Sequence, residues 1–116
     1  MVDSPDPFAS VAQPPSTPVP LTAVYDTATL TLTVTFDQAL VAKTLGGGGP
    51  WTIIAAGFGR SVLSKTMAGT TATIVTDAGT PAIDPDNVIY TPPPNNIQSL
   101  ATGANAAPFS IVPTIV

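Results

Sequence analysis

The segment Thr29–Phe36, TLTLTVTF, alternates threonine with a large apolar residue at every step. The apolar positions are Leu30, Leu32, Val34 and Phe36. A period of two predicts a β-strand with one buried face and one solvated face, because successive side chains of a strand point to opposite sides. Threonine keeps a high β-propensity on the solvated face without adding charge. The chain is therefore expected to build antiparallel sheets.

Further segments have the composition of strands and are separated by turn residues. We predict seven strands and two hairpins, with turns at residues 26–28 and 68–70. The expected strands are Val19–Tyr25, Thr29–Phe36, Trp51–Ala56, Arg60–Met67, Thr71–Thr76, Val88–Thr91 and Pro108–Val116. Turn signals every ~8–12 residues favour a single antiparallel β-sandwich of immunoglobulin type with Greek-key connections. The fold class is all-β, and residues 19–116 form the domain.

The intervening segments are expected to be loops. Glycines 46–49, closed by Pro50, lack the Lys-Ser/Thr pair and the helix of a phosphate-binding loop, so we interpret them as a plain loop. Residues 57–59 are predicted to be a turn whose Phe58 projects outward. Residues 77–87 and 92–107 are long connections, and one helical turn at Asn96–Leu100 is compatible with the second.

Residues 1–18, MVDSPDPFASVAQPPSTP, differ from the rest in their proline content. Proline lacks a backbone donor and suits neither a helix interior nor a central strand. We expect an extended N-terminal arm that is disordered on its own. Two interpretations stay open: a terminus without a role, or an arm that docks on a neighbouring subunit through Phe8 and Val11.

Composition excludes several classes of function. The chain of 116 residues has no cysteine and no histidine, which removes thiolate chemistry, the commonest general base and the commonest zinc ligand. Three basic residues, Lys43, Arg60 and Lys65, against a net charge of −4 argue against nucleic-acid binding. No apolar run approaches the ~20 residues of a membrane span, and the N-terminus lacks the pattern of a signal peptide. We therefore expect no enzyme activity, no cofactor and no membrane insertion.

The remaining polar residues offer weak candidates for chemistry. Ser64 and Lys65 are adjacent on a predicted strand and point to opposite faces, so they do not form a nucleophile and base. Asp84, Asp86 and Asn87 form a candidate calcium site in a loop close to Asp77. The plainer interpretation of that loop is a solvated turn, because Asp and Pro are favoured there.

Aromatic residues are few. Tyr25, Phe36, Tyr90 and Phe109 are expected in the core, with the Tyr90 hydroxyl near a loop backbone. For Trp51 two interpretations stay open, a core anchor or a surface contact. Phe58, together with Phe8 and Val11 of the arm, is a candidate partner contact.

Two stretches together resemble a family of bacterial immunoglobulin-like repeats named after a cyanobacterial swimming-motility surface protein. The stretches are LTLTVTFDQAL and VIYTPPPNNIQSLATGANAAPFSI. Matching positions are Leu30, Leu32, Phe36, Asp37, Leu40, Tyr90, Pro92, Pro93, Gln98, Gly103, Asn105 and Phe109. The resemblance covers roughly residues 19–116. It departs after Ile97-Gln98, where Ser99 stands in place of the acid that the family often has after Leu-Gln, and where Ala104 separates Gly103 from Asn105, so no cation site is carried over. It implies a sandwich used in tandem on large secreted surface proteins, without catalysis.

These observations lead to two main hypotheses of function. The first is a structural virion protein, most simply a bacteriophage capsid decoration, spike or fibre protein located on the virion surface and anchored by its arm. The alternative is a spacer or adhesion module of a bacterial adhesin, surface-layer or motility protein, outside the cell. Either would place the chain in a multicopy assembly with other surface proteins, with at most weak glycan or host-surface contact. A dedicated carbohydrate-binding module is disfavoured, because Phe58 and Trp51 alone make a poor aromatic platform.

Overall fold

A computed structural model describes residues 16–78 and 84–116. The expected contacts of Phe8 and Val11 lie outside these residues. The described chain forms ten strands and contains no helix. The strands are β1 (Pro20–Asp26), β2 (Thr31–Phe36), β3 (Lys43–Gly46), β4 (Trp51–Ala55), β5 (Phe58–Arg60), β6 (Val62–Ala68), β7 (Thr71–Thr76), β8 (Asn87–Tyr90), β9 (Phe109–Ile111) and β10 (Thr114–Ile115).

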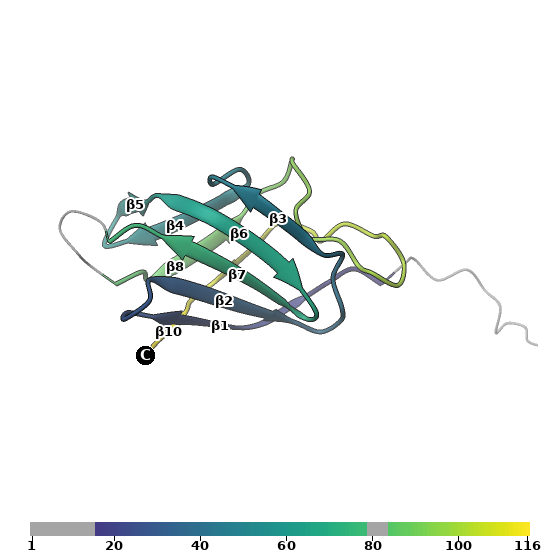
Figure 1. The fold of residues 1–116 in the computed structure, drawn as a ribbon, viewed down its shortest axis with the longest axis horizontal. Coiled ribbons are helices and arrows are strands. Elements are labelled where there is room, and N and C mark those ends of the chain that lie inside the picture. The colour runs from purple at the N-terminus through teal and green to yellow at the C-terminus, as the bar shows by residue number, and fades with distance from the viewer. Residues whose placement is uncertain (1–15, 79–83) are drawn as a thin grey trace, which may run out of the picture.

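The strands assemble into two sheets that pack face to face (Figure 1). One sheet has six strands in the order β10-β1-β2-β7-β6-β3, and the other has four in the order β5-β4-β8-β9. All pairings are antiparallel except that of β10 with β1. The predicted all-β sandwich is confirmed, with the apolar core between the sheets.

The alternation in β2 sets the two faces of the larger sheet. Leu32, Val34 and Phe36 are buried, whereas the threonines between them lie on the outer face. Cross-strand pairing extends this outer face into a row of four threonines, Thr33 with Thr73, Thr73 with Thr66, and Thr66 with Thr44. The buried apolar side chains supply the hydrophobic stabilisation of the sheet. The threonines keep β-propensity on the outer face without adding charge.

Both predicted hairpins are present. In the first, the Asp26 carboxylate accepts the backbone N–H groups of Ala28 (2.8 Å) and Thr29 (3.3 Å), and β2 begins at Thr31, after the turn. In the second, Gly69 has φ +57°, a left-handed conformation that suits glycine.

The structure corrects three predictions about strands. No strand is predicted between residues 36 and 51, but β3 lies there and pairs with β6 from Lys43 to Gly46, the first residue of the predicted glycine loop. The predicted turn at 57–59 includes β5, because the expected strand 60–67 is divided at Ser61 between the two sheets. The last predicted strand is likewise divided into β9 and β10, which belong to different sheets.

The connection after β8 also differs from one of the predicted alternatives. Residues 96–100 form no helical turn; Gln98 and Ser99 instead make isolated bridges to Asn105 and Leu40. The short tertiary pairings satisfy the backbone groups that a helical turn would otherwise satisfy internally.

The turn between β4 and β5 holds Ala56 at φ +50°, a conformation that disfavours any residue with a Cβ. Glycine adopts it without strain, although it also increases the entropy of the unfolded chain. Ala56→Gly is therefore expected to raise the free energy of unfolding by up to about 1 kcal/mol. Chemical denaturation checks this, with Ala55→Gly, in the neighbouring strand, as a control that should destabilise.

Candidate functional site

Two buried charged side chains, Arg60 and Lys65, each donate to main-chain carbonyl oxygens. The first, Arg60, is the last residue of β5. Arg60 Nη1 donates to the carbonyl of Asp77 (2.7 Å) and to the Tyr25 hydroxyl (3.3 Å). The Tyr25 hydroxyl also lies 3.0 Å from Thr76 Oγ1. These bonds tie β5 to β1 and to the end of β7, across the point where the chain changes sheets.

The second, Lys65, points from β6 into the sandwich and is only 2% exposed. Its ammonium donates to the carbonyl oxygens of Gly47 (2.6 Å) and Gly46 (3.4 Å). Burial lowers the pKa of Lys65 below its ordinary value of 10.5. The lysine thus closes the glycine loop with main-chain bonds, and Ser64 lies on the other side of the strand, as predicted.

The glycine loop lies close to this lysine. A Cβ at Gly49 would lie 3.2 Å from Lys65 Nζ and 4.0 Å from Asn96 Oδ1, and Gly49 has φ +57°. Both the positive φ and the close approach to Lys65 favour glycine at this position. The predicted plain loop therefore covers the buried ammonium of Lys65 and accepts hydrogen bonds from it.

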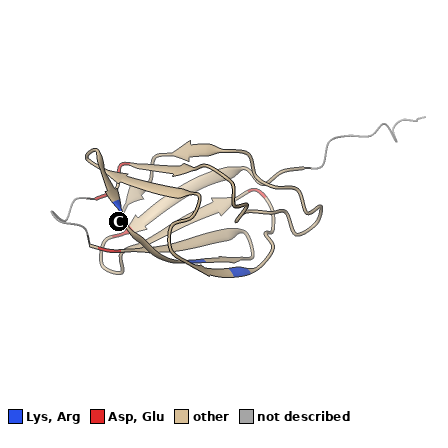
Figure 2. Cartoon of the chain, turned by 90° about the horizontal axis from the view of Figure 1, so that it is seen from above, with Lys and Arg blue, Asp and Glu red and all other residues tan. Residues whose placement is uncertain are grey.

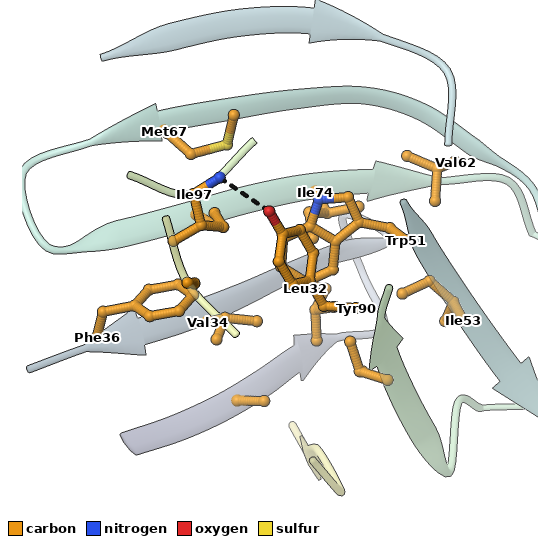
Figure 3. Packing of buried hydrophobic residues seen from close by; sticks show 14 of the residues in the cluster. Leu32, Val34, Phe36, Trp51, Ile53, Val62, Met67, Ile74, Tyr90 and Ile97 are labelled. Carbon is orange, nitrogen blue, oxygen red and sulfur yellow. Dashed lines mark hydrogen bonds between the residues drawn. The ribbon is translucent and has the colours of Figure 1, made fainter. Parts of the chain in front are cut away.

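Tyr90 holds the long segment that follows β8. Its buried hydroxyl accepts the N–H groups of Asn96 (3.0 Å) and Ile97 (3.1 Å), the second of which is drawn in Figure 3. Burial raises the pKa of this hydroxyl above 10.0, while the two backbone donors act in the opposite direction. The predicted position of the Tyr90 hydroxyl beside a loop backbone is confirmed, and Ile97 is carried into the core by this bond.

An aromatic cluster lies beneath this segment. The ring centroids of Trp51 and Tyr90 are 4.9 Å apart, and Phe109 stacks on Tyr90 at 5.2 Å. Trp51 is only 4% exposed, so of its two interpretations the core anchor is confirmed. Its Nε1 is buried without a hydrogen-bond partner among the described residues.

The candidate calcium ligands have a structural environment of their own. Asp86 Oδ2 accepts the N–H of Ala56 (3.1 Å), and Asp84 is exposed. Asp77 lies against Ser61, whose N–H it accepts at 3.3 Å. Among residues 16–78 and 84–116, no group of three or more acidic residues is placed to hold a metal ion. Figure 2 shows how few of the described residues are charged.

Several large apolar side chains are exposed, and of these the sequence analysis named only Phe58. Phe58, a predicted contact residue, is 68% exposed at the start of β5. Five others lie on β1, on the residue before it, or on the C-terminal segment that flanks it. This β1 edge patch consists of Val19, Leu21, Val112, Ile115 and Val116.

The patch occupies one edge of the six-stranded sheet. β10 pairs with β1 only at Val24 and Tyr25, and Val116 continues the contact by accepting from Thr27 and donating to the Tyr25 carbonyl. On this side of β1, Leu21 to Ala23 have no strand partner within the described part of the chain. The register of β1 against β2 shifts between Pro20 and Thr22, and Pro113 precedes β10, so a bulge and a proline interrupt this edge.

Comparison with known proteins adds no neighbour. No protein-family model, curated protein or solved structure matches the chain. The described residues include no helix that is both long and apolar enough to cross a bilayer.

Proposed function

We propose that this chain is a non-enzymatic structural protein of a virus particle, most simply a bacteriophage decoration, spike or fibre protein. The sandwich would be displayed on the surface and anchored through the N-terminal arm. The observation that carries the proposal is how the two buried charged side chains are bonded. Arg60 donates to a main-chain carbonyl and to the Tyr25 hydroxyl, and Lys65 donates to main-chain carbonyls, so both stabilise the fold. A group engaged in this way supports architecture and offers nothing to a substrate.

The attachment of the arm supports anchoring. Ser16 accepts a bond from Gln38 Nε2 (3.0 Å) through its hydroxyl, and its carbonyl accepts from Thr102 Oγ1 (3.1 Å). Pro18 is buried. The chain is therefore fixed to the sandwich from Ser16 onward. A force applied to residues 1–15 would be transmitted to the folded domain.

The ends of the described chain favour a second candidate, a tandem spacer or adhesion module of a secreted bacterial surface protein. The described chain begins at one end of the long axis of the sandwich, and the C-terminus lies at the other (Figure 1). Domains that follow one another in an extended array need this placement. The resemblance to bacterial immunoglobulin-like repeats supports the same candidate.

Fractionation of the native source separates the two candidates. An antibody against the sandwich should detect the chain in density-gradient fractions that contain virus particles. Detection in the cell envelope of uninfected cells, within a polypeptide much longer than 116 residues, would instead support the spacer.

Removal of residues 1–15 tests the anchor. At low protein concentration the deletion should change the free energy of unfolding by less than about 0.5 kcal/mol, because the bonds of Ser16 and the burial of Pro18 are retained. The same deletion should abolish co-sedimentation with the particle. A truncated chain that still co-sediments would show that the arm is not the anchor.

A further inference from the structure

We propose that the parallel pairing of β10 with β1 is a mechanical clamp, which resists unfolding when the domain is pulled through its two ends. The inference deepens the proposed function and rests on it for the source of the force, because a fibre or a tandem spacer carries tension from one end of each domain to the other.

The direction of the two strands carries this inference. β1 and β10 are the first and last strands of the described chain, and they lie side by side and parallel. The chain enters β1 at one end of the sandwich and leaves β10 at the other (Figure 1). Tension between the two ends therefore pulls β1 by its first residue and β10 by its last, in opposite directions along the strand axis. In an antiparallel pair the two loaded ends would lie together, and the pairing would open from that end.

Hydrogen bonds of Val116 extend the pairing beyond β10. Its N–H donates to the Tyr25 carbonyl (2.9 Å), and its carbonyl accepts the N–H (3.2 Å) and the hydroxyl (3.1 Å) of Thr27. The bonds of a parallel ladder are evenly spaced along the strands, so a load along the axis is shared among them. They must then break together, which slows the unfolding step that determines resistance to force.

The entry end of β1 is fixed to the sandwich as well. The Val19 N–H donates to the Asp37 carboxylate, and the Asp37 N–H donates to the Val19 carbonyl, each at 3.0 Å. Gln38 and Thr102 bond to Ser16 nearer the arm. β1 then pairs with β2 at six positions and with β10 at only two. The contact between β1 and β10 is therefore the weaker one, and it sets the force at which the domain opens.

The last residues are held by main-chain hydrogen bonds more than by apolar burial. Ile115 is 39% exposed and Val116 is 61% exposed, whereas Pro113, directly before β10, is buried. Removal of one hydrogen bond at Val116 should therefore change the free energy of unfolding only modestly. The same removal takes away a large share of the bonds that tension must break, so resistance to force should fall much more.

Pulling direction tests the clamp, since the native chain has no cysteine and a handle can be attached at a chosen one. The full-length chain is stretched between handles at its two ends. In the comparison, one handle is at the C-terminus and the other at Ala28→Cys, an exposed position in the turn between β1 and β2, so that β10 is peeled away from β1. At the same loading rate, the unfolding force should be at least twofold higher between the two ends. Equal forces would overturn the proposal.

A matched pair of proline variants tests the named bonds. Val116→Pro removes the N–H that bonds to Tyr25, and the control Thr91→Pro removes an exposed residue's N–H that bonds to the Pro50 carbonyl at 2.8 Å, outside the clamp. Without load, both variants should lose similar amounts of stability. Under constant tension between the two ends, Val116→Pro should unfold at least tenfold faster than Thr91→Pro. Equal rates would contradict the clamp, and the comparison of pulling directions requires neither proline variant to fold.

Both measurements use the isolated chain, so they are independent of where the protein is found. Equal forces in the two directions would reject the clamp and leave both candidate functions unchanged. Absence of the chain from virus particles and from cell envelopes would reject those candidates, while a twofold difference in force would still establish the clamp.

Discussion

Replacing Trp51 by alanine is expected to lower the free energy of unfolding by about 4 kcal/mol. The indole is almost fully buried and packs against Tyr90 and Phe109, with ring centroids 4.9 and 5.8 Å away. Its removal would leave a cavity between the sheets that the surrounding strands cannot fill without moving. Equilibrium denaturation followed by circular dichroism measures the change, because the variant lacks the only tryptophan.

Two controls separate packing from polarity. Trp51→Phe keeps an aromatic ring and removes the unpartnered Nε1, so it should cost less than half as much as Trp51→Ala. Phe58→Ala deletes an exposed ring and should change stability by less than about 0.5 kcal/mol. If Phe58→Ala proved as damaging as Trp51→Ala, the assignment of the core would be wrong.

Tyr90→Phe has the next largest expected effect, a loss of about 3 kcal/mol. The substitution removes one oxygen and leaves the buried N–H groups of Asn96 and Ile97 without an acceptor, at roughly 1–3 kcal/mol for each. Hydrogen exchange should locate the effect, with faster exchange of both amides.

Tyr25→Phe is the matched control. Its loss should be nearer 1 kcal/mol, because Arg60 and Thr76 both also bond to the Asp77 carbonyl.

Tyr90→Phe is also expected to change how the free energy of unfolding depends on alkaline pH. Because burial raises the pKa of Tyr90 above 10.0, the folded state holds this proton longer than the unfolded state does. Its stabilising contribution is complete below pH 10.0 and is lost as pH rises through the higher folded value. Lys65 acts oppositely: its lowered pKa makes the fold gain stability as pH rises toward 10.5. Subtracting the pH profile of Tyr90→Phe from that of the native chain should therefore isolate a decline above pH 10. A flat difference would contradict the role of burial.

The alternation of apolar and polar residues was enough to predict which side chains of the central strands β2 and β7 are buried. In β2 and β7, buried and outer residues follow one another without interruption, so the period of two gave the correct faces. Tyr90 could also be placed, because a tyrosine before three prolines ends its strand where a loop backbone is near. These inferences depend only on local pattern.

Alternation failed where a bulge shifted the register. The sequence of β6 suggests that Leu63, Lys65 and Met67 share a face, yet Leu63 is exposed and Val62 is buried. The register of β6 against β7 shifts between Val62 and Ser64, and an extra residue there reverses the faces on one side of the bulge. Strand β3 was missed because its four residues, KTLG, end in glycine and gain their order from pairing with β6.

The exposure of the β1 edge patch could not be predicted from the sequence, for a different reason. Val19, Leu21 and the terminal valines look like ordinary strand residues, and whether they are covered depends on which strand lies at the edge. Sheet order is a non-local property that one sequence does not specify. The arrangement β10-β1-β2, with a two-residue β10, leaves these side chains uncovered.

The row Thr33, Thr73, Thr66 and Thr44 covers the centre of the outer face of the larger sheet with uncharged hydroxyl groups. With a net charge of only −4, adjacent molecules repel one another weakly, and salt has little left to screen. Contacts made through this face would therefore depend little on ionic strength.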